Sequence, residues 1–423
     1  MLLSRYNWKS LTNRAQNSRK GVFAVNVLLI AFFLYLFSSI TFIVSITGKK
    51  WKTSKEGFAN RLGMAGFVLA LAGVVCHVIF VVNRIIVGGH FPTSNMFEFM
   101  SFLGLCIALF YLIIFWIYRL RALGAFAMPL AVILIAYASV FPTEIQPLIP
   151  ALQSYWLYVH VTTVALGQGA LAIGAVAGLI SLLRTVDRKS RGAFWLEIIL
   201  LLVVMVIAFI ILYFSFSGAG YHAAYEHIAD AGTPDERIVQ QEYVLPPIVK
   251  PQNAEVISVP PFLGMEMGWF EAPSWMQGVD AATKFNTVIW SVVGGLVLYG
   301  ILRLFARKRL IDRLYGLVKG VDGELAEEIS YRAIAIGYPL FTLGGLIFAM
   351  IWAHEAWGRF WGWDPKEVWA LITWLFYSAY LHLRLSRGWQ GENAAWLAVG
   401  GFIIIMINLV VVNLVVSGLH AYA

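Results

Sequence analysis

The sequence predicts an all-α polytopic membrane protein with about ten transmembrane helices and an external tryptophan-rich loop. Of its 423 residues, 60% are hydrophobic and only 13% are charged, with a mean hydropathy of +0.75. A soluble domain is nearer half apolar and a quarter charged. A helix crosses a bilayer in about 20 apolar residues and satisfies its own backbone hydrogen bonds there. Runs of this kind lie at residues 22–46, 64–87, 97–118, 123–141, 156–183, 194–216, 286–306, 333–353, 367–385 and 394–417.

The basic residues between these runs predict how the helices are oriented, because short cytoplasmic loops are rich in Lys and Arg. One side of the membrane receives the basic loops 49–52, 119–121, 184–191, 307–309 and 384–387. We expect this side to be the cytoplasm, and the chain to lie in a bacterial cytoplasmic membrane. The N-terminal tail is also basic, although ten spans would place it outside, so the side on which it lies stays open.

The chain is expected to have four parts. A basic tail and the first membrane helix occupy residues 1–61, and helices 2–6 occupy 62–216. Residues 217–285 form an extracytoplasmic insertion, in which acidic residues outnumber basic ones and two Pro-Pro pairs occur. Helices 7–10 then occupy 286–423. Whether the insertion folds by itself is left open.

The basic residues and the cysteines exclude several classes of protein. The net charge of +8 does not indicate nucleic-acid binding, because the basic residues lie between apolar runs, where orientation signals belong. Cys76 and Cys106 lie inside apolar runs, which favours buried thiols that pack as small hydrophobes. Neither Cys-x-x-Cys nor Cys-x-x-Cys-His occurs, so we expect no covalently bound haem and no thiol oxidoreductase. A cleavable signal peptide is not expected, because run 22–46 is long enough to span the membrane.

Residues 352–369 are the most informative stretch. An aromatic belt places one or two rings at each helix end. Here thirteen residues hold Trp357, Phe360, Trp361, Trp363 and Trp369. Gly358 and Gly362 lie among these rings and let the backbone approach a flat object closely. The pattern favours a large planar ligand over membrane anchoring.

The same stretch contains a helix start and two cations. Asp364 can cap a helix that begins at Pro365, and Glu367 has the spacing that completes a capping box. The rings therefore lie at the outer surface, just before this helix. Arg359 and Lys366 are placed to pair with carboxylates. Haem, an apolar macrocycle with two propionates, meets both demands; a quinone, a lipid or plain interfacial anchoring remain alternatives.

These residues also carry a resemblance to a known family. The pattern Trp-Gly-x-x-Trp-x-Trp-Asp-x-Lys-Glu, starting at Trp357, resembles the tryptophan-rich "WWD" signature of the cytochrome c assembly family. The turn from Gly89 to Glu98 is similar to the Gly-x-x-Pro-x-Ser-Asn-x-x-Glu turn of its CcsA/ResC branch, which belongs to the system II haem attachment machinery. The resemblance covers roughly residues 62–185 and 330–423. Family members often have Asn at the position of His354, so this residue receives no family role.

The histidines can be sorted by their expected depth in the membrane. His160 and His420 lie near the outer ends of their helices, at the level of the tryptophan loop, so two imidazoles could bind one haem iron there. His382 lies 17 residues beyond Pro365, roughly 25 Å further in. No other histidine matches its depth, so a second ligand would come from another chain. In the family a CcsB/ResB-type membrane partner is held to supply it.

The resemblance implies haem b as the ligand, bound at an inner site (His382) and an outer site (His160, His420 and the tryptophan loop). The outer site would present haem to apocytochrome c, as part of a holocytochrome c synthase with the CcsB/ResB-type partner; thiol-reducing proteins are possible further partners. One alternative is a respiratory subunit that keeps b-type haem permanently, although such folds usually pair histidines at both depths. A small-molecule transporter is less favoured, because few intramembrane charges occur.

Overall fold

The computed structural model describes residues 3–48, 55–145, 148, 150–229, 236–264, 266–273, 280–386 and 388–412. His420 lies outside these residues. The chain divides into two compact units, one formed by residues 1–186 and 314–423 and the other by residues 187–313.

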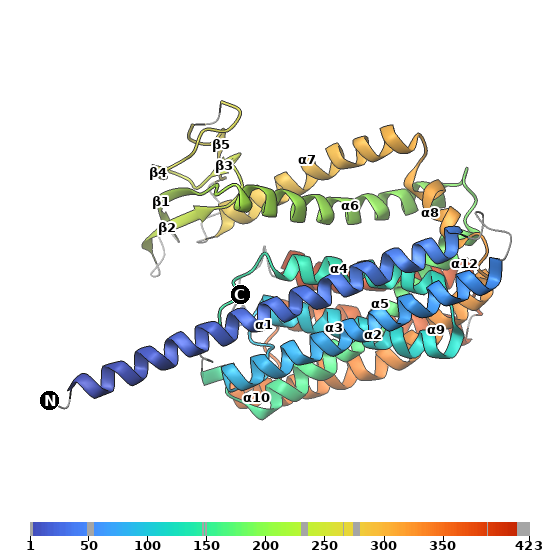
Figure 1. Cartoon of the computed structure of the whole chain (residues 1–423), viewed down its shortest axis with the longest axis horizontal. Helices are drawn as coiled ribbons and strands as arrows, with labels where there is room; N and C mark the ends of the chain where they lie inside the picture. The colour runs from blue at the N-terminus through green and yellow to red at the C-terminus, as the bar shows by residue number, and fades with distance from the viewer. Residues whose placement is uncertain are drawn as a thin grey trace. The chain divides into compact units, whose positions relative to one another are not determined.

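Unit 1 is a bundle of long helices that run alongside one another (Figure 1). Its N-terminal part consists of α1 (Leu3–Thr47), α2 (Lys55–Gly88), α3 (Met96–Tyr118), α4 (Arg121–Ala138), the 3-10 turn η2 (Pro150–Leu152) and α5 (Tyr155–Thr185). Its C-terminal part consists of α9 (Gly323–Thr342), the π-helical segment η3 (Leu343–Phe348), α10 (Ala349–Trp357), α11 (Pro365–Ser386), α12 (Glu392–Met406) and a second π-helical segment, η4 (Ile407–Val412). The short helix α8 (Leu310–Val318), which no apolar run predicted, connects the two units.

Helix α5 is the most enclosed helix of the bundle, and small residues make this possible. A Cβ atom added to Gly167 would lie 2.6 Å from the backbone nitrogen of Phe341 on α9. On another face, a Cβ atom added to Gly169 would lie 2.8 Å from the Cβ of Cys106 on α3. Small residues let membrane helices approach closely in this way. The buried position of Cys106 agrees with the packing role expected from the sequence.

Unit 2 is a helical hairpin with a small β-structure at one end (Figure 1). The hairpin consists of α6 (Arg191–Gly218) and α7 (Ala281–Ala306). Between them, β1 (Ala223–Ala229) pairs with β2 (Arg237–Tyr243) and β4 (Glu255–Ser258) in an antiparallel sheet. The short strands β3 (Val249–Lys250) and β5 (Phe270–Glu271) form a parallel pair. The insertion therefore folds as β-structure, around a cluster that includes Tyr221, Tyr225 and Tyr243.

The predicted polytopic all-α membrane fold is confirmed. Within the described residues, nine helices are long and apolar enough to cross a membrane, and each overlaps a predicted run. The run at 333–353 belongs to a continuous helical segment, Gly323–Trp357, made of α9, η3 and α10. The tenth run, 367–385, forms α11, which is long enough but not among the nine. Its tryptophans and tyrosines and the polar Lys366, Glu367 and Arg384 make it less apolar than the others.

Candidate functional site

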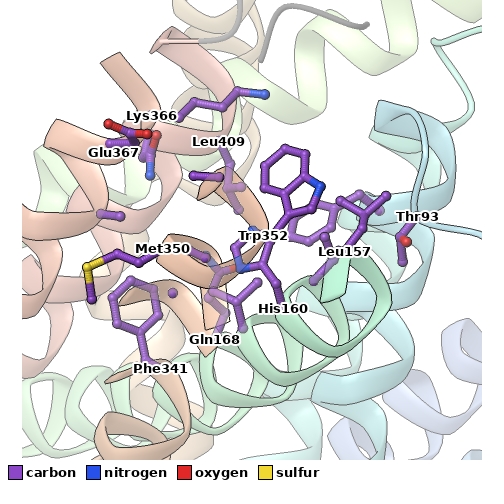
Figure 2. A pocket seen from close by; sticks show the side chains of 18 of the residues that line it. Thr93, Leu157, His160, Gln168, Phe341, Met350, Trp352, Lys366, Glu367 and Leu409 are labelled. Atoms are coloured by element: carbon purple, nitrogen blue, oxygen red, sulfur yellow. The ribbon is translucent and has the colours of Figure 1, made fainter. Parts of the chain in front are cut away.

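A cavity of about 200 Å³ lies in unit 1, where α5, α11 and the two π-helical segments come together. Figure 2 shows its side chains converging from these segments, which lie far apart in the sequence. The apolar walls include Leu157, Phe341, Met350, Trp352 and Leu409. Polar groups are few, which is typical of a pocket for a mostly apolar ligand. They come from His160, Gln168, Lys366, Glu367, Asn408 and the turn at 93–95.

His160 is held in this wall by two contacts. Its Nδ1 lies 2.8 Å from the carbonyl oxygen of Gly344, and its ring stacks on Trp352 with 5.7 Å between centroids and 9° between planes. A carbonyl oxygen only accepts, so Nδ1 carries the proton and the lone pair of the neutral ring is on Nε2. Histidines that ligate metals usually donate the other ring N–H to a carbonyl or carboxylate in this manner. The geometry therefore suits His160 as an axial ligand through Nε2.

The carbonyl that receives His160 is positioned by a π-helical turn. In η3, the hydrogen bonds of α9 shift, and such turns occur frequently at functional sites. Gly344 lies directly against α5, because a Cβ atom at this position would lie 2.3 Å from the backbone nitrogen of Val164. Only glycine fits here, so the close approach of η3 to α5 is what brings the carbonyl within reach of His160.

The tryptophan loop is closed by the predicted capping box. The carboxylate of Asp364 accepts from the backbone amide of Lys366 at 3.3 Å. The Oε2 atom of Glu367 accepts from the backbone amides of Gly362 at 2.7 Å and Asp364 at 3.2 Å. Helix α11 begins at Pro365, as the sequence predicts. Glu367 thus fixes the loop relative to the first turn of α11.

The tryptophans of the loop lie in different environments. Trp361 lines the cavity, whereas Trp357 packs edge-to-face on Trp352 at 4.8 Å, within a cluster formed by the first turns of α5 and the end of α10. Trp363 is 70% exposed and packs edge-to-face on Trp361 at 5.8 Å. Its φ of 57° is a conformation that bulky residues rarely adopt, and such strain clusters at functional sites. Trp369 is half-buried on α11 and is not among the residues of the cavity wall.

The two basic residues of the loop, Lys366 and Arg359, also lie in different environments. Lys366 lines the cavity from the first turn of α11, outside the candidate membrane spans. Burial lowers the pKa of Lys366 from 10.5 to about 8, and the carboxylate of Asp364 opposes this shift. Arg359 is exposed, and its guanidinium lies against Gly362, where an added Cβ would be 2.8 Å from Nε. Of the two, Lys366 is the cation that a ligand in the cavity would meet.

A buried ion pair supports the wall formed by residues 93–96. Arg84 and Glu98 are each 2% exposed, and Glu98 accepts from both Nε and Nη2 of Arg84. Glu98 also accepts from the amide and hydroxyl of Ser94, while Asn95 caps α3 by accepting from the amide of Glu98. The remaining nitrogen of Arg84 donates to the carbonyl of Thr143 at 2.7 Å. Arg84 therefore ties together α2, the start of α3 and the segment around Thr143.

His382 lies apart from this cavity, towards the other end of α11. Its side chain is exposed, and no side chain within the described part of the chain is bonded to its ring. Neighbouring Arg384 instead faces α9, where it pairs with Glu327 at 3.1 Å. Among the described residues, no group of three or more His, Cys, Asp or Glu could hold a metal ion. A ligand at His382 would thus need a second donor from elsewhere.

Sequence reasoning missed three residues in and around the cavity: Arg84, Gln168 and Gly344. A charged residue inside the apolar run 64–87 was a usable signal for Arg84. Gln168 is 4% exposed, lies two helical turns from His160 on α5, and has a buried Oε1 without a partner among the described residues. The role of Gly344 depends on a register shift in the helix, for which the sequence carries no recognised signal.

The sequence is similar to a known protein family and to several of its members. The family model described as "Cytochrome C assembly protein" matches residues 93–221 and 290–420. The chain is 32% identical over 369 residues to a cytochrome c biogenesis protein CcsA of Trichormus variabilis, covering 86% of this chain and 88% of the relative. It is 33% identical over 374 residues to the CcsA of Nostoc punctiforme, covering 86% and 89%. With the CcsA of Gloeobacter violaceus it shares 30% identity over 370 residues, covering 86% of each chain.

Proposed function

The chain belongs to the cytochrome c assembly protein family, in its CcsA-type branch, and we propose that its outer cavity binds haem b and presents it for covalent attachment to apocytochrome c. A role in cytochrome c biogenesis follows from the family. The single observation that carries the finer proposal is the setting of His160. The Nδ1–H of His160 donates to the carbonyl of Gly344, so Nε2 is the ring nitrogen whose lone pair would bind the haem iron.

The other groups around the cavity fit haem as the cargo. Trp352, Trp361 and Leu409 offer apolar contact to the macrocycle, and the ammonium of Lys366 offers a charge-assisted hydrogen bond to a propionate. The buried Oε1 of Gln168 accepts hydrogen bonds, so it suits a water or a protonated carboxyl. His420 is proposed as the second axial ligand; it lies outside the described residues.

The size of the cavity supports presentation rather than permanent storage. Its volume of about 200 Å³ is below the roughly 300–1,000 Å³ of pockets that enclose a ligand of drug size. A cavity of this size does not enclose a whole haem, so in this proposal an edge of the macrocycle stays outside it. An exposed edge is what a second protein requires, and the exposed, strained Trp363 lies next to the loop wall.

The attachment itself needs little from this chain beyond positioning. Each cysteine thiol of an apocytochrome adds its sulfur to one carbon of a vinyl group and its hydrogen to the other, so electrons balance without a further oxidant or reductant. We assign no catalytic acid or base. The chain would contribute by holding haem and approaching thiols in register, as part of a haem lyase with a CcsB/ResB-type partner.

In the same proposal, the protein lies in the bacterial cytoplasmic membrane, with the tryptophan loop and the 217–285 insertion outside. The acidic insertion and the basic loops at the other helix ends support this orientation. A cysteine placed at Ser258, on exposed strand β4, should react with an impermeant maleimide in cells whose outer barrier has been opened. Labelling only after lysis of the cytoplasmic membrane would reverse the orientation.

The haem proposal is tested by haem content per protein molecule. Purified full-length protein should contain acid–acetone-extractable haem with the spectrum of haem b. His160→Gly should lower outer haem and cytochrome c maturation at unchanged protein abundance, and added imidazole should restore both. His354→Gly is the matched control, because His354 is exposed, stacks on Phe360 at 4.2 Å and does not line the cavity. A haem-free preparation that still matures cytochromes would overturn the proposal.

A further inference from the structure

Gln168 lies on the face of α5 that lines the cavity, in the same row as His160. The eight positions between them place Gln168 about 12 Å further along the helix. Its neighbours Gly167 and Gly169 pack closely against α9 and α3, respectively. Because successive residues lie about 100° apart around a helix, Gln168 points between these two contacts and into the cavity.

Two buried polar atoms of the cavity wall have no hydrogen-bond partner among the described residues. Gln168 is 4% exposed and its Oε1 atom is unbonded, and Thr93, on the turn before α3, is 9% exposed with an unbonded Oγ1 atom. Figure 2 shows Thr93, Gln168 and Lys366 apart from one another around the pocket. A buried polar group without a partner lowers the stability of a protein. These groups are therefore placed for a bound molecule to satisfy.

The side chains of haem make two of its edges chemically different. Its two vinyl groups are on neighbouring pyrrole rings and its two propionates are on the other two rings, so the vinyl and propionate edges face in opposite directions. A vinyl group has no hydrogen-bonding atom. A propionic acid can donate its O–H to Oε1 of Gln168 and accept from Nε2 through its carbonyl. Apolar walls favour this neutral form of a carboxyl over its anion.

We propose that Gln168 orients haem, by binding one propionic acid group inside the cavity so that the vinyl edge stays outside. This inference rests on the proposed function, in which the thiols of an apocytochrome must reach the vinyl groups. The rise of about 12 Å from His160 to Gln168 is of the same order as the distance from the iron of haem to its carboxyl groups. The cavity does not enclose a whole haem, so the edge that enters it decides which edge is accessible.

Gln168→Met tests this role, because methionine has a similar length and lacks the amide. Gln241→Met is the matched control. Gln241 lies on β2, is 7% exposed, and also has an Oε1 atom without a partner among the described residues, but it does not line the cavity. Removing an unsatisfied buried amide should leave the melting temperature of the haem-free protein near or above that of the wild type in both variants.

Binding is measured by titrating the purified full-length proteins with haem and with its dimethyl ester, whose carboxyl groups cannot donate a hydrogen bond. Gln168→Met should weaken the binding of haem about fivefold and that of the dimethyl ester less than twofold, whereas Gln241→Met should change neither. Because the two ligands are compared within one variant, a general effect on folding cancels. Equal weakening of both ligands, or of neither, would overturn the inference.

Orientation is measured by chemical access to the carboxyl groups of bound haem. A water-soluble carbodiimide with an amine converts exposed carboxyls to amides, and the mass of the extracted haem counts them. We expect at most one amide per haem in the wild type and two in Gln168→Met. Two amides in the wild type would place the propionate edge outside and overturn the inference, with haem binding intact. Haem content that does not depend on His160 would instead contradict the proposed function.

Discussion

The two ends of α11 differ in how their polar groups are satisfied. At the start of α11, Asp364 and Glu367 bond three backbone amides, and the first turn lines a cavity that α5, η3 and η4 complete. At the other end, His382 is exposed, and Arg384 is committed to carboxylates of α9. Around the start of α11 this chain supplies a cavity, whereas at His382 its described residues supply one imidazole. The proposed function would explain this contrast if this chain presents haem at the cavity and a partner contributes at His382.

The largest effect is expected at the contact that assembles the outer end. In Gly344→Leu, the new side chain would overlap the backbone of α5, because even its Cβ would lie 2.3 Å from the amide nitrogen of Val164. We expect a loss of more than about 3 kcal/mol, low membrane abundance and no outer haem. Gly300→Leu on α7 is the control, since a Cβ there meets nothing within 4 Å. Normal outer haem in Gly344→Leu would show that the π-helical contact is not needed.

The next prediction concerns the order in which haem occupies the two proposed sites, at His382 and at His160. If haem passes from the inner site to the outer one, His382→Ala should empty both sites, whereas His160→Gly should empty only the outer site. Each loss should exceed the roughly 10–100-fold that removal of an outer-shell partner costs. Haem content and spectra are measured on proteins purified with the membrane partner. An occupied outer site in His382→Ala would exclude an obligatory inner site.

A smaller effect should depend on pH at Lys366. Burial lowers the pKa of Lys366 to about 8, so in the folded protein the ammonium is present below pH 8 and lost above it. Between about pH 8 and 10.5 only the unfolded chain is charged there, so this group makes the ligand-free protein more stable as pH rises. Haem affinity should do the opposite and fall about tenfold from pH 7 to 9, as a charge-assisted hydrogen bond to propionate is lost.

The pH prediction is checked by haem titrations of three proteins. Lys366→Arg should bind haem with little change between pH 7 and 9, because an arginine keeps its charge. Lys366→Met should bind weakly at both values. A wild-type affinity that does not change over this range would argue against contact between Lys366 and a haem carboxylate.

The smallest effect concerns the capping box. Glu367→Ala leaves the amides of Gly362 and Asp364 without their acceptor and should cost about 1 kcal/mol. Hydrogen exchange at residues 361–364 should then speed up about fivefold, with a modest loss of outer haem. Glu367→Gln keeps an acceptor oxygen in a capping box and should remain close to the wild type. Equal exchange in all three proteins would mean that the loop is held by its aromatic contacts.

The sequence alone predicted the membrane fold, because length and hydrophobicity of a run decide whether a helix can cross a bilayer. It also predicted the local geometry at Asp364, Pro365 and Glu367, since a helix cap depends only on residues a few positions apart. The runs did not indicate α8 or the β-structure of the insertion. Both are short, and their pairing depends on contacts such as those of β1 with β4 across a bulge.

The sequence also singled out His160, Trp361, Lys366 and Glu367, which the structure brings to one cavity. Only the tertiary structure decided that the carbonyl of Gly344 receives His160 and that the ring of His160 stacks on Trp352. The physical reason is the separation in sequence over which each effect acts. Hydropathy and capping act within one segment, whereas a cavity wall depends on how closely two helices approach. At α5 and η3 that approach is possible because Gly344 has no side chain. The sequence shows the glycine, but only the packed helices show that α5 lies against it.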